Sequence, residues 1–313
     1  MKAKNKYEIN QSPFYKCCSH SRLAKILGIE KKTLSNIIER GDKNYYFSTL
    51  SSGRDIQVPK FQLKRIHSRI QSLLSRISTP DYLNSGVSGR SNVKNAFDHV
   101  GYKRTAKIDI KSYYNKTSQQ LVESCFRKQF SCSKDVAETI SKLCCVQGHL
   151  ATGSPISQII AFYVNKNVFD KVERYSAGKN IKFTLYVDDL TFSGESVSRD
   201  FIRHVIFIIK KDRDYDLHKI RHFNPSTPKP ITGAVVDGNT VKVKNSHRKI
   251  ISEYLNKVNY YSKANIEDEK RERFFQILIG HLFSAGQING RYYQMGYKMV
   301  DLRKRLNIKA VNR

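Results

Sequence analysis

Two stretches of the chain alternate apolar and polar residues with the period of a half-buried strand. In residues 106–110 the apolar side chains point one way, while Lys107 and Asp109 point the other. Residues 183–193 alternate on both sides of an adjacent acidic pair. We expect a strand in the first stretch and a hairpin in the second, with the acidic pair at its tip.

The N-terminal region has apolar residues at helical spacing over residues 21–38, with a break near Gly28. The pattern predicts two short helices. Ala24, Gly28, Ile29 and Leu34 also have the spacing of a helix-turn-helix that reads DNA. The alternative is a helix pair that packs on the rest of the protein, and we favour it because short turn motifs often match by chance.

A second hairpin is predicted farther along the chain, with strands over residues 45–50 and 54–59 and a turn at residues 51–53. A helix should follow it. The apolar face of that helix would contain Leu63, Ile66, Ile70, Leu73 and Leu74.

The charge of the chain indicates a nucleic-acid partner. Lys and Arg number 56 against 27 Asp and Glu, which gives a formal net charge of +29 and a pI near 9.9. Residues 241–313 contain 16 Lys and Arg and only 6 Asp and Glu. Interleaved with them are Tyr254, Tyr260, Tyr261, Tyr292, Tyr293 and Tyr297. Basic side chains hold a backbone and aromatic faces accept unpaired bases, although we expect about half of these tyrosines to pack a helical core.

The six cysteines show none of the C-x-x-C spacing that a zinc site needs, and the chain starts without an apolar signal segment. We therefore expect reduced thiols and a cytoplasmic location. No run of about eighteen apolar residues occurs, so we expect no membrane partner.

The carboxylates suggest the chemistry. Asp109 lies on the first predicted strand, and Asp188 and Asp189 form the pair at the later hairpin. Hard cations such as Mg²⁺ prefer carboxylate and phosphate oxygens, and a nucleic-acid polymerase holds two such ions against a nucleotide triphosphate with this set of carboxylates. For the pair alone, the alternative is a solvated turn, since acidic residues are common in turns.

Five short motifs occur along the chain. They are N-A-x-x-H at residues 95–99, a catalytic strand motif at 107–114, a variant of L-P-x-G-x-P-x-S at 150–157, Y-x-D-D at 186–189 and I-T-G at 231–233. In this order they resemble a bacterial retron-type reverse transcriptase, an RNA-directed DNA polymerase that makes multicopy single-stranded DNA (msDNA). The N-A-x-x-H signature separates this family from group II intron and diversity-generating reverse transcriptases.

Three positions depart from the family pattern. Ala151 stands where the family often has Pro, Gln158 where a second Pro is frequent, and Ser112 where an acidic residue is common. None of the departures removes a metal ligand. They bear on template or nucleotide preference.

The resemblance implies the roles of the catalytic residues. Asp109 and Asp188 would bridge two Mg²⁺ ions, replaceable by Mn²⁺, and Asp189 would support the site. Tyr114 would be the aromatic gate that disfavours ribonucleotides by crowding the 2′-OH, and a core tyrosine is its alternative.

Nucleotide-binding residues are implied in the same way. Arg54 would contact the incoming triphosphate, with a solvated surface arginine as the alternative. Gly153 would let the backbone approach the nucleotide and Thr152 would offer a small polar contact, with a plain loop as the alternative. Lys219 aligns loosely with the lysine that protonates pyrophosphate.

The resemblance also implies an α+β fold shaped like a right hand, with fingers, a ferredoxin-like palm and a helical thumb. We expect N-terminal helices and fingers over residues 1–100, the palm over 101–240 and a basic, RNA-binding thumb over 241–313. His99 would be structural or contact RNA. The expected RNA-binding residues are Asn95, His99, Arg291, Tyr292 and Arg303.

Retron membership implies several partners. They are a structured noncoding RNA that templates the DNA, the dNTPs, the msDNA product and a separately encoded effector that acts in defence against phage. Synthesis would begin from the 2′-OH of a guanosine in that RNA. The alternative function is a binding protein that has kept a polymerase fold without catalysis, and the presence of all three aspartates argues against it.

Overall fold

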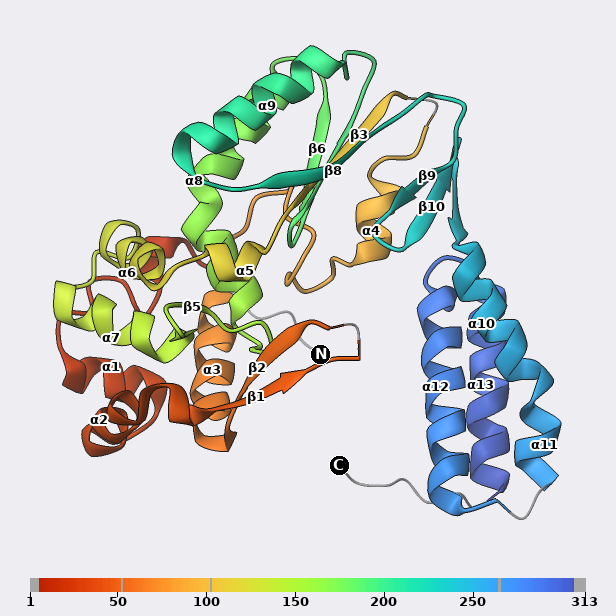
Figure 1. Ribbon diagram of the computed structural model, residues 1–313, viewed down its shortest axis with the longest axis horizontal. Coiled ribbons are helices and arrows are strands. Elements are labelled where there is room, and N and C mark those ends of the chain that lie inside the picture. The colour runs from red at the N-terminus through yellow and green to blue at the C-terminus, as the bar shows by residue number, and fades with distance from the viewer. Residues whose placement is uncertain (1–5, 52, 102, 264–265, 307–313) are drawn as a thin grey trace. The chain divides into compact units, whose positions relative to one another are not determined.

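A computed structural model describes residues 6–51, 53–101, 103–263 and 266–306 of the chain. The chain forms two compact units (Figure 1), and it passes between them three times. Unit 1 contains residues 1–91 and 106–222, and unit 2 contains residues 92–105 and 223–313. The division into fingers, palm and thumb that we expect from the sequence stays a prediction. In the structure, residues 92–105 group with the C-terminal part of the chain and not with the N-terminal helices.

Unit 1 begins with the elements that the apolar pattern predicts. After a short 3-10 turn, η1 (Ile9–Gln11), come α1 (His20–Leu27) and α2 (Lys31–Arg40), and Gly28 ends α1 in the left-handed conformation with φ 71°. A second 3-10 turn, η2 (Gly41–Asn44), precedes β1 (Tyr45–Thr49), β2 (Asp55–Pro59) and α3 (Phe61–Leu74). The two short helices, the hairpin and the following helix are thus present. Ser52 of the predicted turn lies outside the described residues.

The apolar faces of α1 and α2 lie in the main core of unit 1, where α1 contacts α3 and α2 contacts α7 (Lys134–Cys144). Leu23, Leu27, Leu34 and Ile37 are all buried there. The structure therefore supports the packed helix pair.

The centre of unit 1 is a four-stranded sheet made of β3 (Thr105–Ile110), β6 (Lys182–Tyr186), β7 (Asp189–Ser193) and β8 (Leu217–Phe223). The spatial order is β6-β7-β3-β8, so the first strand in the chain lies between the third and the fourth. This is the strand order of a ferredoxin-like sheet. The predicted α+β class with a ferredoxin-like palm is confirmed.

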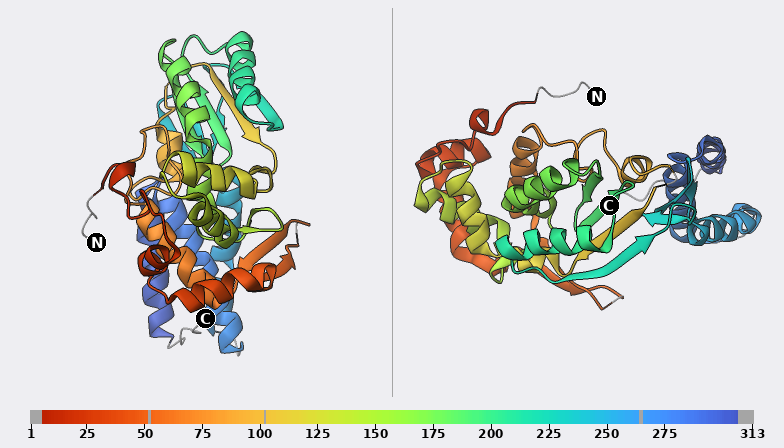
Figure 2. Two further views of the ribbon diagram at one scale, coloured as in Figure 1. Left: turned by 90° about the vertical axis from the view of Figure 1, so that its left-hand side faces the viewer. Right: turned by 90° about the horizontal axis from the view of Figure 1, so that it is seen from above.

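Helices fill the connections of this sheet. Between β3 and β6 the chain forms α5 (Tyr113–Lys116), α6 (Gln119–Lys128), α7, the small hairpin of β4 (Cys145–Val146) and β5 (His149–Leu150), and the long helix α8 (Ser157–Ala177). Between β7 and β8 it forms α9 (Arg199–Asp212). Helices α8 and α9 lie side by side on one face of the sheet (Figures 1 and 2).

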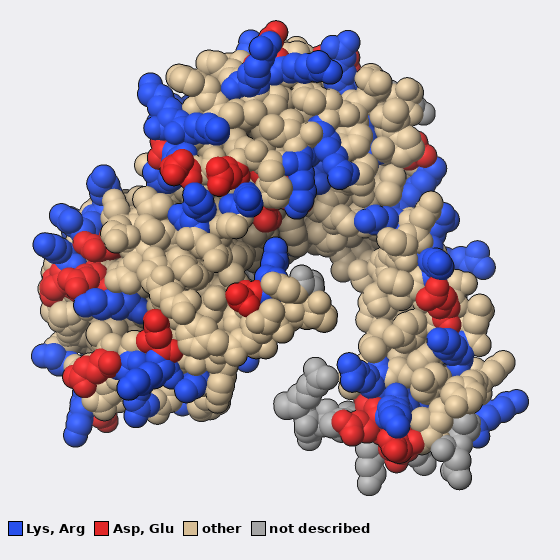
Figure 3. Space-filling view, in the orientation of Figure 1, with Lys and Arg blue, Asp and Glu red and all other residues tan. Residues whose placement is uncertain are grey.

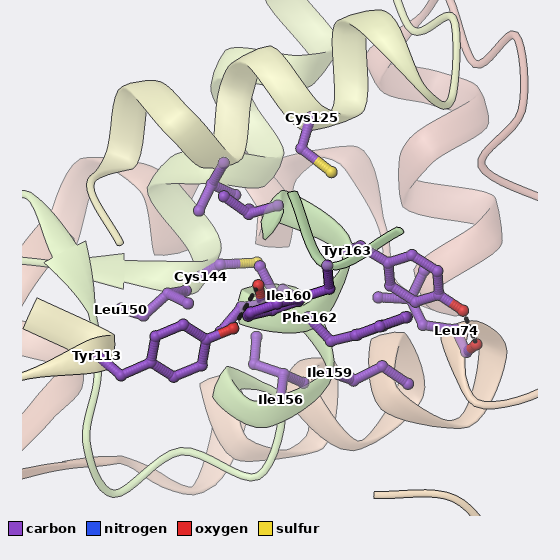
Figure 4. Packing of buried hydrophobic residues seen from close by; sticks show 14 of the residues in the cluster. Leu74, Tyr113, Cys125, Cys144, Leu150, Ile156, Ile159, Ile160, Phe162 and Tyr163 are labelled. Atoms are coloured by element: carbon purple, nitrogen blue, oxygen red, sulfur yellow. Dashed lines mark hydrogen bonds between the residues drawn. The ribbon is translucent and has the colours of Figure 1, made fainter. Parts of the chain in front are cut away.

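The core of unit 1 is aromatic where the helices meet the sheet. Phe183 and Phe192 stack across β6 and β7 with ring centroids 5.1 Å apart, and Phe201 of α9 meets Phe192 edge to face at 5.4 Å. Deeper in the unit, the hydroxyl of the fully buried Tyr113 donates to the carbonyl of Ala161 in α8 (Figure 4). These contacts fix the segment that follows β3 against α8.

All six cysteines are free thiols, and five of them are buried. No helix in the described part of the chain is long and apolar enough to cross a membrane.

Unit 2 combines a small sheet with a helical bundle. The sheet contains β9 (Lys229–Ile231), β10 (Ala234–Asp237) and β11 (Thr240–Val243), with α4 (Asn92–Phe97) packed on it. The bundle contains α10 (Asn245–Asn256), α11 (Val258–Lys263), α12 (Asp268–Gly286) and α13 (Gly290–Arg305). A Cβ atom at Gly286 would lie 2.7 Å from the ring of Tyr293, so a glycine is needed where α12 and α13 pack.

Candidate active site

The acidic pair lies at the tip of the β6–β7 hairpin, as its position in the sequence predicts. Tyr186 pairs with Asp189, so Val187 and Asp188 form a two-residue turn. Val187 has φ 60°, a conformation that strains a β-branched residue. Its N–H donates to the hydroxyl of the buried Ser85 at 2.9 Å, and this bond holds the strained turn.

A backbone hydrogen bond joins this turn to the neighbouring strand. The N–H of Ile110 donates to the carbonyl of Asp188 at 3.0 Å. Asp109 precedes Ile110 on β3, so the bond brings its carboxylate beside the turn. The structure therefore brings Asp109 together with the pair Asp188 and Asp189, which begins 79 residues later in the chain.

The surroundings of Asp188 raise the pKa of its carboxyl group. Burial, which has the largest effect, and the negative charges of Asp109 and Asp189 together raise the pKa of Asp188 from 3.8 to about 6. The positive charge of Arg54 acts in the opposite direction. A half-buried carboxylate beside other carboxylates is a place where a bound cation would lower the electrostatic energy.

Two lysines partly neutralise the other carboxylates. Lys219 Nζ lies 2.7 Å from Asp109 Oδ2, and Lys107 Nζ lies 3.4 Å from Asp189 Oδ1. The ion pair with Asp109 raises the pKa of Lys219. His218 also contacts Asp109, with Nδ1 3.2 Å from its carbonyl oxygen and Nε2 3.8 Å from Oδ2. Each carboxylate outside the turn thus has a cationic or imidazole neighbour.

The donor set fits a divalent ion that shares its ligands with a substrate. Within the described residues, no group of three or more His, Cys, Asp or Glu side chains is gathered closely enough to form a metal cage. Mg²⁺ is usually bound by one or two carboxylates together with water and substrate phosphates, rather than by a cage made only of protein. Asp109 and Asp188, which interact electrostatically, are the residues suited to such a site.

Besides Lys219, two more of the predicted nucleotide-binding residues lie close to the carboxylates. Burial and the charge of Asp188 raise the pKa of Tyr114 to about 12, and the charge of Arg54 opposes this. Asp188, Tyr114 and Arg54 are therefore electrostatic neighbours. Tyr114 is partly buried and packs against the core of unit 1 beside Tyr113, and Arg54 is exposed just before β2.

Thr152 and Gly153 pack against β2. The hydroxyl of Thr152 donates to the side-chain oxygen of Gln57 at 3.0 Å, and the N–H of Gly153 donates to the carbonyl of Gln57 at 3.1 Å. A Cβ atom at residue 153 would lie 2.8 Å from that carbonyl. The close approach that requires a glycine is thus to the backbone of Gln57 and the side chain of Val58.

The N-A-x-x-H and I-T-G motifs meet inside unit 2. Thr232 donates its hydroxyl to the carbonyl of Asn92, and the side-chain amides of Asn92 and Asn95 donate back to Thr232 at 2.9 Å and 3.4 Å. Asn95 and His99 are fully buried. The predicted RNA contact by these two side chains does not fit this burial, whereas the structural alternative for His99 does.

The predicted RNA-binding residues of the bundle differ in accessibility. Arg291 is exposed at the start of α13, and Tyr292 is partly buried. Arg303 lies 3.4 Å from the carboxylate of the buried Glu272, so its charge is already engaged within the bundle. Among the six tyrosines, Tyr260, Tyr293 and Tyr297 are exposed and the other three pack on the bundle core, as expected for about half of them.

Three contributors to the site were not predicted from the sequence: Lys107, His218 and Ser85. The sequence pattern could have identified Lys107, because it lies two residues before Asp109 and shares its strand face. No sequence pattern could have identified His218 and Ser85, since their contacts depend on how β8 and the segment before α4 pack near the β6–β7 hairpin.

A ferredoxin-like sheet with one carboxylate on its first strand and two at the turn between its second and third strands is the arrangement of a polymerase palm. Comparison of the chain with known proteins shows which polymerases it resembles. No protein-family model matches the chain. The chain is 26% identical over 201 residues to the Retron Se72 reverse transcriptase of Salmonella heidelberg (strain 579083-10), across 61% of this chain and 51% of that protein.

Two Escherichia coli proteins are similar as well. The Retron Ec86 reverse transcriptase is 23% identical over 196 residues, which is 59% of this chain and 61% of that protein. The Retron Ec48 reverse transcriptase is 25% identical over 274 residues, which is 78% of this chain and 65% of that protein. The chain thus resembles retron reverse transcriptases and spans about half to two thirds of the length of these relatives.

Solved structures with a related chain trace include telomerase from Candida albicans in complex with a fragment of telomeric RNA. It has a TM-score of 0.41 and 10% identity, across 91% of this chain and 54% of that chain. A foamy viral protease-reverse transcriptase in complex with an RNA/DNA hybrid has a TM-score of 0.44 and 13% identity, across 84% and 33%.

The raised pKa of Asp188 leads to a prediction about stability in EDTA. The folded state binds the Asp188 proton up to about pH 6 and the unfolded state only to about pH 4, so stability falls as the pH rises through this window. Asp188→Asn should therefore raise the free energy of unfolding at pH 8 by up to about 3 kcal/mol. Thermal unfolding should show the gain shrinking toward pH 5.

Asp216→Asn is the matched control, because Asp216 is an exposed carboxylate paired with Lys116 on the same unit. It should leave the melting temperature nearly unchanged. Added Mg²⁺ should stabilise the unmodified protein more than the Asp188→Asn variant. Equal melting temperatures for that variant and the unmodified protein across this pH range would contradict the raised pKa of Asp188.

Proposed function

We propose that this chain is a retron reverse transcriptase, an RNA-directed DNA polymerase that copies part of a structured noncoding RNA into msDNA. The observation that carries the proposal is the meeting of Asp109 with Asp188 and Asp189 on a palm-type sheet. The similarity to retron reverse transcriptases supports the choice of template and product.

In this proposal Asp109 and Asp188 hold two Mg²⁺ ions, which Mn²⁺ can replace, and Asp189 supports them from β7. When bound, the ions stabilise charge on the attacking hydroxyl and on the triphosphate. Lys107 holds the carboxylate of Asp189, and the hydrogen bond from Ile110 holds the turn that presents Asp188. In-line attack on the α-phosphate forms the new phosphodiester bond and releases pyrophosphate.

The surrounding residues would bind and select the nucleotide. Arg54 would place its planar guanidinium on the triphosphate. Thr152 and Gly153 would shape the wall of the site through their bonds to Gln57. Tyr114 would lie beneath the sugar and crowd a 2′-OH. Lys219, whose side chain is 61% exposed, would leave Asp109 for the pyrophosphate and donate a proton to it.

The expected biological setting is that of the family. Synthesis would start from the 2′-OH of a guanosine in the cognate RNA, and the DNA would stay covalently joined to that RNA. A separately encoded effector would act with the complex in defence against phage. Lys and Arg are spread over both units (Figure 3), which suits a ligand that contacts a large surface.

Primer extension on an RNA template tests the catalytic carboxylates. Asp109→Asn and Asp188→Asn should each lower the rate by at least about 100-fold, because each removes charge that holds the metal ions. Asp216→Asn should retain the rate. If Asp188→Asn extends the primer as fast as the unmodified protein, the proposed mechanism is wrong. If the unmodified protein is itself inactive, the binding-protein alternative is favoured.

The nucleotide site is tested by comparing dNTP and NTP incorporation. Tyr114→Ala should lower discrimination against ribonucleotides by about 10- to 100-fold, whereas Tyr114→Phe, which keeps the ring, should not. Arg54→Gln should raise the KM for dNTPs by at least about tenfold, because a charge-assisted bond to phosphate is lost. Unchanged discrimination in Tyr114→Ala would show that Tyr114 is not the gate.

The retron assignment is tested by expressing the chain with the DNA that flanks its gene and analysing the nucleic acid that copurifies. We expect short DNA whose size shifts after ribonuclease treatment, and we expect Asp189→Asn to lack it. If the unmodified protein carried only RNA, or the variant carried the same DNA, priming from the cognate RNA would be refuted.

A further inference from the structure

The small sheet of unit 2 has one covered face and one open face. On the covered face Ile231, Ala234 and Val236 are fully buried together with Ala96 of α4. On the other face Val235 pairs with Pro230 on one side and with Lys242 on the other, which makes a row across all three strands. Pro230 and Val235 are partly exposed, so within the described residues this row is not fully covered.

A cavity of about 630 Å³ is lined by Pro230, Val235 and Lys242 of this row, together with residues of α10 and α13. Its apolar side is formed by Pro230, Val235 and Ile288 and by the ring of Tyr292. Lys244 and Arg248, at the start of α10, line it as well. The volume is within the range of cavities that hold small organic ligands. All the lining residues belong to unit 2.

The charge of the cavity is not balanced within the described chain. Lys242, Lys244 and Arg248 face a single acidic lining residue, Asp237, which is already paired with Lys242 at 2.5 Å. Among the described residues no carboxylate forms an ion pair with Lys244 or Arg248, and the Arg248 guanidinium donates a hydrogen bond to the side-chain oxygen of the neutral Asn245. Two uncompensated cations therefore lie beside an apolar and aromatic wall.

We propose that this cavity binds one unpaired nucleotide of the bound RNA. The base lies against Val235 and the ring of Tyr292, and the phosphates on either side of it lie on Lys244 and Arg248. Unpaired nucleotides are recognised by this combination of flat apolar surface and basic side chains. The inference rests on the proposed function in that RNA is the ligand, and it adds a site away from the catalytic carboxylates.

Binding of a fluorescein-labelled ten-nucleotide oligouridylate, followed by anisotropy in EDTA without dNTPs, tests the phosphate contacts. The double variant Lys244→Gln/Arg248→Gln should bind about tenfold more weakly at moderate salt. Its slope of log K against log salt should fall by about 1.4, because each lost single-strand phosphate contact accounts for about 0.7. Both side chains are exposed, so the fold should tolerate the change.

The matched control is Lys249→Gln/Lys257→Gln, which removes two exposed lysines of unit 2 that do not line the cavity. It should weaken binding much less. An equal loss of affinity and of slope in both double variants would show that the effect is general charge, and the cavity would not be the site.

Photo-cross-linking with the same oligonucleotide containing 5-iodouridine tests the base contact. The cross-link should map to Tyr292 and persist in Tyr292→Phe, and it should be lost in Tyr292→Leu, which removes the ring. Displacement of the cross-link by a lower concentration of polyglutamate peptide than of unlabelled oligouridylate would assign the cavity to an acidic peptide instead.

The two proposals fail separately. Primer extension by the unmodified protein together with no cross-link at Tyr292 would overturn the cavity assignment and leave the polymerase standing. Absence of both RNA binding and primer extension would overturn the proposed function itself.

Discussion

The hydrogen bond from the Ile110 N–H to the Asp188 carbonyl is the contact on which the candidate site depends. It fixes β3 beside the turn of the β6–β7 hairpin, so that a carboxylate from one strand lies next to two from another. The turn is strained at Val187, and the Ser85 hydroxyl holds it. Strain of this kind persists only where the surroundings over-determine the backbone, which is what these two bonds provide.

Gathering the carboxylates has an electrostatic cost. Burial and the neighbouring carboxylates both raise the pKa of Asp188, and the placement of Lys107 and Lys219 reduces the repulsion at the neighbouring aspartates. Lys219 is largely exposed and Lys107 is not. A mobile cation and a fixed one would have different roles: the fixed lysine positions a carboxylate, and the exposed one is free to move to a substrate phosphate.

The motifs that mark the chain as retron-like also have structural roles of their own. Asn92, Asn95 and Thr232 bond to one another where α4 meets β9. Nearby, the fully buried Lys229 donates to the carbonyls of Gly101 and Pro225. These bonds tie residues 92–105 to the C-terminal part of the chain and give unit 2 a sheet with one covered face. Residues of this sheet also line the cavity beside Tyr292.

Much of this protein was determined by local sequence. The alternation around Asp109 and Asp188, the helices around Gly28 and the hairpin before Phe61 follow from apolar spacing and turn residues, which act over a few positions. Long-range effects were decided by tertiary structure. The burial of Asn95 and His99, the engagement of Arg303 by Glu272 and the contact of Gly153 with Gln57 join residues far apart in the chain. Burial and charge pairing depend on which elements pack together, and no local pattern encodes that.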